Sequence, residues 1–207
     1  MEDAEEVIMM FDKLIIATGN AGKYKEFKEI IHSCSDEFAR EIIFAPDIAK
    51  LIVDETGKSY SENAMLKAKA WSDKSGLPCL ADDSGLEVDA LDGAPGLYSA
   101  RIIQGNDGDK VSWLLHELED ESNRNAHLTA SLALSVPKEF MLITEGYCYG
   151  TIAHSPRGIN GFGYDPIFIP NGYELTFAEL SSSVKNQISH RADAFRKIIS
   201  LIHKNYA

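Results

Sequence analysis

Two long strand-like runs, residues 127–136 and 140–152, constrain the fold of this chain more than any other feature. Only residues 137–139 separate them, so the simplest connection is a hairpin, which makes the two strands antiparallel. The other strand-like runs are shorter and alternate with helical patterns. The sequence therefore predicts an α/β fold with a mixed, twisted central sheet flanked by helices.

Apolar periodicity predicts the remaining elements. The expected strands are 14–17, 41–44, 78–88 and 166–169, and the expected helices are 21–31, 59–74, 109–118 and 186–206. Ser59 and Glu62 are expected to form a capping box at the start of the second helix. No repeat, low-complexity tract or long linker divides the 207 residues. We expect one domain over residues 12–207, preceded by an N-terminal extension of residues 1–11.

The charge and the cysteines exclude several classes of protein. A net charge of −12 argues against binding long nucleic acid, although local lysines and arginines with a metal still suit a small phosphorylated ligand. The three cysteines include no CxxC pair, so neither a disulfide framework nor a zinc site is indicated, and Cys79 and Cys148 are expected in the core. The acidic N-terminus does not resemble a secretory signal, and no apolar run reaches the length of a membrane span. We expect a protein of the reducing cytoplasm.

An acidic pair, Asp82 and Asp83, follows an apolar run and precedes Ser84 and a glycine. We expect the pair at the end of a buried strand, where adjacent carboxylates offer the hard oxygen ligands that suit Mg²⁺. The alternative is a solvated turn, because Asp, Ser and Gly are ordinary turn residues. The acidic pair alone does not distinguish a buried strand end from a solvated turn, so the other motifs of the sequence have to be considered.

The segment Thr18-Gly-Asn-Ala-Gly-Lys23 lies between a predicted strand and a predicted helix. Such a junction offers free backbone N–H groups and the positive end of the helix dipole, both of which favour an anion. The segment is not a Walker A loop, because its glycines are too close together and Tyr24 replaces the Ser or Thr that would bind Mg²⁺. An ordinary strand-to-helix turn with a surface lysine is the alternative.

A second group of candidates surrounds the predicted helix 59–74. Asn63 and Lys67 are four residues apart and share one face of that helix, and Glu55 precedes it. A solvated helix face explains Asn63 and Lys67 by themselves. Glu55 is a candidate site residue only if folding brings it close to Asp82 and Asp83.

Two further segments carry unusual residue choices. In residues 161–166, Phe162 lies between two glycines, and an aromatic held on such a backbone can stack on a nucleobase; the alternative is a core position. Ser189 is a natural N-cap for the last helix, followed by His190 and Arg191. Arginine at this position opposes the helix dipole, which costs some helix stability. A cost in stability that no neighbouring residue offsets hints at a functional role, such as binding a phosphate or carbonyl oxygen through the guanidinium.

Taken together and in this order, the motifs resemble those of the inosine/xanthosine triphosphate pyrophosphatases, or HAM1-like family, from about Leu14 to Ile202. The matching segments are residues 18–23, 61–64 with Lys67, 81–86, 93–96 with Tyr98-Ser-Ala-Arg101, 161–166 and 189–191. The resemblance implies an elongated fold of two lobes around a central cleft, and a homodimer. It also implies Mg²⁺-dependent hydrolysis of ITP, dITP and XTP to the monophosphate and pyrophosphate.

The resemblance also implies roles for individual residues. Asp83 would be the catalytic carboxylate and a Mg²⁺ ligand, Glu55 (or its neighbour Asp54) the second metal ligand, and Asp82 a supporting group. The implied substrate-binding residues are Thr18, Gly19, Asn20, Ala21, Gly22, Lys23 and Lys67 for the triphosphate, Ser84, and Phe162, Gly163, Tyr164, Asp165, Lys185, His190 and Arg191 around base and sugar.

Three other interpretations remain open from the sequence. A Maf-like nucleotide pyrophosphatase would carry a first loop rich in Ser and Arg, which residues 18–23 do not match. A non-catalytic nucleotide-binding module would not need Asp82, Asp83, Lys67 and His190 together. A generic acidic interaction domain would require the ordered motifs to be coincidental turns and caps.

Overall fold

The computed structural model describes residues 10–35 and 37–206. Its single mixed sheet has the strand order β2-β1-β3-β4-β5-β6. The strands are β1 (Phe11–Ile16), β2 (Ala39–Phe44), β3 (Cys79–Val88), β4 (Asn125–Val136), β5 (Phe140–Ile152) and β6 (Phe168–Pro170). The pairs β1·β2 and β1·β3 are parallel and the others antiparallel. The predicted hairpin is confirmed as β4·β5, in register from Asn125↔Thr151 to Val136↔Phe140.

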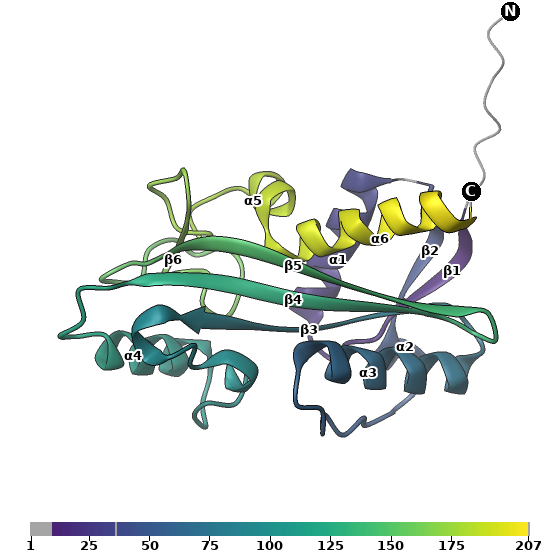
Figure 1. Cartoon of the computed structure of the whole chain (residues 1–207), viewed down its shortest axis with the longest axis horizontal. Coiled ribbons are helices and arrows are strands. Elements are labelled where there is room, and N and C mark those ends of the chain that lie inside the picture. The colour runs from purple at the N-terminus through teal and green to yellow at the C-terminus, as the bar shows by residue number, and fades with distance from the viewer. Residues whose placement is uncertain (1–9, 36, 207) are drawn as a thin grey trace, which may run out of the picture.

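Helices cover both faces of this sheet (Figure 1). The helices are α1 (Ala21–Cys34), α2 (Ala45–Ile48), α3 (Tyr60–Ser75), α4 (Asp107–Glu117), α5 (Ser182–Ile188) and α6 (His190–Tyr206), with 3₁₀ turns η1 (Asp89–Leu91) and η2 (Gly96–Tyr98). In the view of Figure 1, α1, α5 and α6 lie above the sheet, and α2, α3 and α4 lie below it. The predicted flanked mixed sheet is therefore confirmed.

Three apolar clusters divide the molecule into two lobes. In the first lobe, α1 and α6 pack on one face of the sheet around Phe27, Phe195 and Ile198, and α3 packs on the other face through Ala64, Ala68 and Trp71. The second lobe is built around Leu114 of α4, together with residues of β3, β4, β6 and the segment after β5. Strands β3, β4 and β5 run through both lobes, which gives the elongated shape seen in Figure 1.

A cleft between the lobes follows from the shortness of β1. Within the described part of the chain, β1 pairs with β3 only at Ile15 and Ile16. The last ladder bond on this side runs from the Ala17 N–H to the Leu80 carbonyl, at 2.8 Å. Beyond that point β3 continues into the second lobe, so its edge from Asp82 onward faces the space that β1 has left.

The structure confirms the predicted strand 78–88 as β3, which begins one residue later, but it corrects the position of the acidic pair within that strand and the continuity of the last helix. The acidic pair does not lie at a strand end, because β3 continues past Asp82 and Asp83 to Val88 and pairs with β4 along its whole length. The last helix is not continuous, because the chain is extended at Ser189 (φ −69°, ψ 155°), which ends α5 before α6 begins. Ser189 Oγ accepts the Ala192 N–H at 3.2 Å and thus caps α6 as expected.

Smaller expectations were met in part. Ser59 caps α3 by accepting the Glu62 N–H, but the Glu62 carboxylate accepts from the Lys58 N–H, one residue before the expected position. Residues 1–9 of the predicted extension lie outside the described residues, and Phe11 already belongs to β1. Across residues 10–35 and 37–206, no helix is both long and apolar enough to cross a membrane.

Candidate active site in the cleft between the lobes

The segment 18–23 forms the turn from β1 into α1 at the floor of the cleft. Asn20 caps the helix by accepting the Lys23 N–H at 3.0 Å, and its own N–H donates to Thr18 Oγ1 at 3.1 Å. A side chain at Gly22 would meet Phe162, whose Cδ1 lies 2.9 Å from where a Cβ would be. The cap uses the Lys23 N–H, so the N–H groups at the very start of α1 remain without an intrahelical acceptor at this end of the helix, with the Phe162 ring close by.

Asp82 lies at the centre of a buried cationic network on the α1 and α6 side of β3. Its carboxylate lies 3.1 Å from Lys23 Nζ and accepts from Arg191 Nε at 3.2 Å. Arg191 Nη2 also donates to Ser84 Oγ, which in turn donates to Asp82. Burial alone would raise the pKa of Asp82, but the positive charges of Lys23, Arg191 and Lys67 outweigh burial and hold this pKa well below its usual range.

Glu26 is a member of this network that the sequence interpretation missed. It accepts from Arg191 Nη1 at 3.0 Å, and Lys185 Nζ lies 3.6 Å from its other oxygen. Glu26 is three residues after Lys23, so both side chains share one face of α1. A carboxylate on the buried side of an amphipathic helix, one turn from a candidate lysine, is the signal that would have found it.

Asp83 belongs to a second network on the α3 side of the sheet. Its carboxylate accepts from Asn63 Nδ2 at 2.9 Å and lies 3.6 Å from Lys67 Nζ, which also donates to Glu55 at 2.6 Å. Arg101 Nη1 lies 3.4 Å from the other Glu55 oxygen. Burial raises the pKa of Asp83, although Lys67 and Asn63 act in the opposite direction. Folding thus brings Glu55 close to Asp83, whereas Asp54 is exposed.

The glycine-rich segment 161–165 closes the cleft from the second lobe. Gly161 and Gly163 have positive φ angles of 76° and 62°, which favour glycine. Between them, the Phe162 ring lies 4.9 Å from Lys185 Nζ and 5.3 Å from Arg191 Cζ, both measured to the ring centroid. The Tyr164 hydroxyl donates to the Ser99 carbonyl, and Asp165 accepts from Lys185 Nζ at 2.6 Å. Phe162 is thus an aromatic face over two cations rather than a core residue.

His190 is buried where α6 begins, beside Arg191. Burial lowers the pKa of His190 well below its usual value, and the positive charges of Arg191 and Lys185 lower it further. The imidazole is therefore neutral at pH 7. Its Nδ1 is buried without a hydrogen-bond partner among the described residues.

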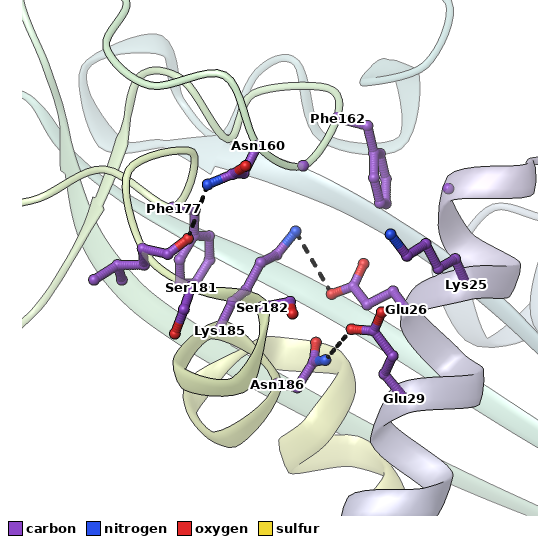
Figure 2. A pocket seen from close by; sticks show the side chains of 13 residues that line it. Lys25, Glu26, Glu29, Asn160, Phe162, Phe177, Ser181, Ser182, Lys185 and Asn186 are labelled. Atoms are coloured by element: carbon purple, nitrogen blue, oxygen red, sulfur yellow. Dashed lines mark hydrogen bonds and ion pairs between the residues drawn. The ribbon is translucent and has the colours of Figure 1, made fainter.

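Three cavities open along the cleft. The 18–23 cavity, about 520 Å³, is lined by residues that include Thr18, Gly19, Asn20, Lys23, Glu55 and Lys67. The middle cavity, about 130 Å³, is lined by residues that include Asn20, Lys23, Ser84, Phe162, Gly163, Tyr164, Asp165, His190 and Arg191. The α1–α5 cavity, about 400 Å³, is lined by residues that include Gly22, Glu26, Phe162 and Lys185. Figure 2 shows Glu26 and Glu29 of α1 facing Lys185 and Asn186 of α5 across the α1–α5 cavity, with Phe162 on one side.

The cavities bring nearly all of the predicted substrate-binding residues into one continuous region. Among the described residues given a role from the sequence, Ala21, Asp82 and Asp83 line none of these three cavities, and neither does Asp54, the alternative to Glu55. Asp83 is nevertheless in contact with Lys67, which lines the 18–23 cavity. A chain of charged groups therefore runs from Glu55 through Lys67, Lys23 and Arg191 to Lys185.

The carboxylates offer a fitting donor set for a divalent cation. Within residues 10–35 and 37–206, no group of three or more His, Cys, Asp or Glu side chains is arranged to hold a metal. Glu55 and Asp83, however, both approach the single ammonium of Lys67, so their oxygens already converge on one positive charge. Mg²⁺ is commonly bound through one or two carboxylates plus waters and substrate phosphates, which is what this pair allows.

Comparison with known proteins identifies the family of this chain. A sequence model of the Ham1 family matches residues 14–201. The dITP/XTP pyrophosphatase of Streptomyces avermitilis is 44% identical over 199 residues, covering 93% of this chain and 98% of that protein. The dITP/XTP pyrophosphatase of Bacillus subtilis is 43% identical over 201 residues, covering 94% of this chain and 99% of that protein.

Solved structures agree with the sequence comparison. The Staphylococcus aureus Ham1 protein superimposes with a TM-score of 0.79 at 36% identity, covering 93% of this chain and 98% of that one. A HAM1 protein from Coxiella burnetii matches with the same TM-score, identity and coverage. Both the sequence and the fold therefore agree over nearly the whole length, and the chain belongs to the Ham1 family.

Proposed function

We propose that this protein is a nucleoside triphosphate pyrophosphatase that hydrolyses ITP, dITP and XTP to the monophosphate and pyrophosphate and so removes non-canonical purine nucleotides. The observation that carries the proposal is the meeting of Lys23, Lys67 and the Asp83 carboxylate in one cleft, beside the N-terminus of α1. Relatives that match nearly the full chain bear the name dITP/XTP pyrophosphatase, which supports the same reaction.

Residues in and beside the 18–23 cavity bind the triphosphate and would hold its metal ion. The first N–H groups of α1 and the ammonium groups of Lys23 and Lys67 bind phosphate oxygens and offset the negative charge that develops on the departing pyrophosphate. Asp83 and Glu55 would hold Mg²⁺, which supplies further charge neutralisation and activates water when bound.

The chemical step needs a base near the α-phosphorus. A water oxygen forms a bond to this phosphorus while the bond to the α–β bridging oxygen breaks, and pyrophosphate leaves with that oxygen. Asp83 orients the water and accepts its proton, a role suited to a carboxylate whose burial raises its pKa. Asn63 holds Asp83 in place through its 2.9 Å hydrogen bond.

The purine base is placed in the region of Phe162, Lys185 and Arg191. The Phe162 ring stacks on the base, a contact worth about 1–3 kcal/mol for nucleobases. The two cations donate to the 6-oxo group and N7, as Arg and Lys do on guanine. Adenine carries an amino group at position 6, so it would leave these buried donors unpaired, and ATP is rejected. Ser84 accepts from Arg191 and Asp165 accepts from Lys185, so these two residues hold the cations in position, and His190 lines the same middle cavity.

We extend the proposal to assembly and location. We propose a homodimer in the cytoplasm, as the family resemblance implies. The exposed apolar side chains of Ile143, Tyr147 and Tyr149 on β5 support a protein contact on that face of the sheet. Light scattering coupled to size-exclusion chromatography would test the dimer, and a monomeric mass would contradict it.

Product analysis tests the proposed reaction directly. The protein is incubated with ITP, XTP, GTP or ATP in the presence of Mg²⁺, and pyrophosphate and orthophosphate are measured separately. We expect pyrophosphate, released mainly from ITP and XTP, and loss of the reaction when EDTA is added. Orthophosphate as the product would contradict the proposal, and so would tight binding of ITP without turnover.

A further inference from the structure

The segment Tyr98-Ser-Ala-Arg101 has no part in the function proposed so far, although it lies at the seam between two cavities. Ala100 lines both the 18–23 cavity and the middle cavity. Arg101 follows it, on the side of the cleft that faces the loop carrying Glu55. The segment therefore occupies a position that a nucleotide spanning the two cavities would pass.

The backbone of this segment is firmly held. Ser99 Oγ accepts the Leu86 N–H of β3 at 2.9 Å and donates to the Gly96 carbonyl at 2.6 Å. The Ser99 carbonyl accepts from the Tyr164 hydroxyl at 3.1 Å. The Arg101 N–H donates to the Tyr98 carbonyl at 2.8 Å, which completes the turn. The base of the Arg101 side chain is thus fixed against the edge of β3.

The guanidinium itself is loosely held and accessible. It lies 5.4 Å from the Tyr98 ring centroid and 3.4 Å from Glu55, and 47% of the Arg101 side chain is exposed. Lys67 approaches the same Glu55 carboxylate more closely, at 2.6 Å, and is 13% exposed. Arg101 therefore lies farther from the Glu55 carboxylate than Lys67 does and is bound less tightly. A competing anion can displace it from Glu55 at little cost in free energy.

We propose that Arg101 is a further phosphate-binding residue, which reaches across the cleft to the outer phosphates of the substrate and to the pyrophosphate that leaves. This inference rests on the proposed function. In the free protein Glu55 holds the Arg101 guanidinium. Arg101 becomes available when Glu55 binds a metal ion instead, and the paired N–H donors of the planar guanidinium match phosphate oxygens. Arg101 then binds phosphate beside Ala100 and Glu55, both of which line the 18–23 cavity.

Binding of separate product fragments tests the inference. Arg101→Ala and Arg101→Lys are compared with the wild-type protein for the dissociation constants of pyrophosphate and IMP, by calorimetry with and without Mg²⁺, and for kcat and KM with ITP. Arg40→Ala is the matched control, because Arg40 is also exposed and lies 3.4 Å from a carboxylate, Asp12, at the far edge of the sheet.

In Arg101→Ala we expect pyrophosphate binding to weaken about tenfold and the KM for ITP to rise by a similar factor, with IMP binding unchanged. Arg101→Lys keeps the charge and should recover part of the loss, and Arg40→Ala should match the wild type. Unchanged pyrophosphate binding, or equal losses for pyrophosphate and IMP, would overturn the inference. If the wild type released no pyrophosphate from ITP, the proposed function would fail instead, whatever the variants bind.

Discussion

Asp82 and Asp83 are adjacent in the chain, but their carboxylates lie on opposite faces of the sheet. The Asp82 carboxylate contacts Lys23 of α1 and Arg191 of α6, whereas the Asp83 carboxylate contacts Asn63 and Lys67 of α3. This separation follows from the alternation of side chains along a strand. The two acids therefore have different electrostatic surroundings, with the pKa of Asp82 lowered and that of Asp83 raised.

Asp83→Asn is expected to abolish turnover and leave the fold intact. An asparagine keeps an oxygen that can accept from Asn63, but it can neither take a proton from water nor offer a charged metal ligand. We expect kcat for ITP to fall by about 10²- to 10⁴-fold or more. Pyrophosphate release and thermal unfolding are the measurements, with Asp73→Asn, an exposed acid of α3, as the control. Activity close to that of the wild type would remove Asp83 from its proposed role.

Lys23→Ala is expected to weaken binding of ITP much more than binding of inosine. The lost ammonium is a charge for phosphate, which inosine lacks. The variant should also be less stable, because a buried ion pair with Asp82 is broken. The informative quantity is therefore the ratio of the two dissociation constants, which partial unfolding leaves unchanged. Lys28→Ala, an exposed position of the same helix, is the control. Equal losses for both ligands would count against the assignment.

Arg191→Ala is expected to lower both stability and base selectivity. Its removal leaves Glu26 and Asp82 buried with fewer cations, so we expect the free energy of unfolding to fall by about 3–5 kcal/mol. The ratio of kcat/KM for ITP over ATP should fall about tenfold, because a donor to the 6-oxo group is lost. Arg196→Ala, an exposed arginine of the same helix, should change neither quantity. An unchanged ITP:ATP ratio would place Arg191 outside the base site.

His190 is expected to make stability depend on pH below about 6.5, the usual histidine pKa. The folded protein keeps His190 neutral because its pKa is lowered, whereas the unfolded chain takes up the proton. Stability is therefore lost as the pH falls, by about 1.4 kcal/mol per pH unit from this residue. Urea unfolding at pH 7.5, 6.5 and 5.5 measures the slope. His190→Gln should flatten it while His127→Gln does not, and equal slopes in both variants would disprove the assignment.

Much of the fold could be predicted because local patterns and tertiary packing agree. The short turn at residues 137–139 left the two long strands little choice but a hairpin, and Ser59 and Ser189 marked the starts of α3 and α6. The apolar periodicity of the last helix, however, masked the break at Ser189. A capping serine inside an apolar periodic run therefore indicates that a new helix begins there.

The site was harder to predict because its geometry depends on where β1 ends. Sequence reasoning placed Asp82 and Asp83 at a strand end, since acids, serine and glycine usually leave a sheet. In the structure they stay within β3, because β4 pairs with it throughout and the departure of β1 opens the cleft at their other edge. Glu26 was missed for a related reason. Its partners Lys185 and Arg191 lie more than 150 residues away in the chain.

The continuity of β3, β4 and β5 through both lobes also determines how the cleft can move. The hydrogen-bonded ladder between β3 and β4 is unbroken from Cys79↔Ser135 to Val88↔Ala126, so it connects the two lobes across the cleft without interruption. This continuous ladder resists rotation of one lobe relative to the other. We therefore expect a nucleotide to be admitted mainly by rotations of side chains and loops at the rim, and the radius of gyration to change little when it binds.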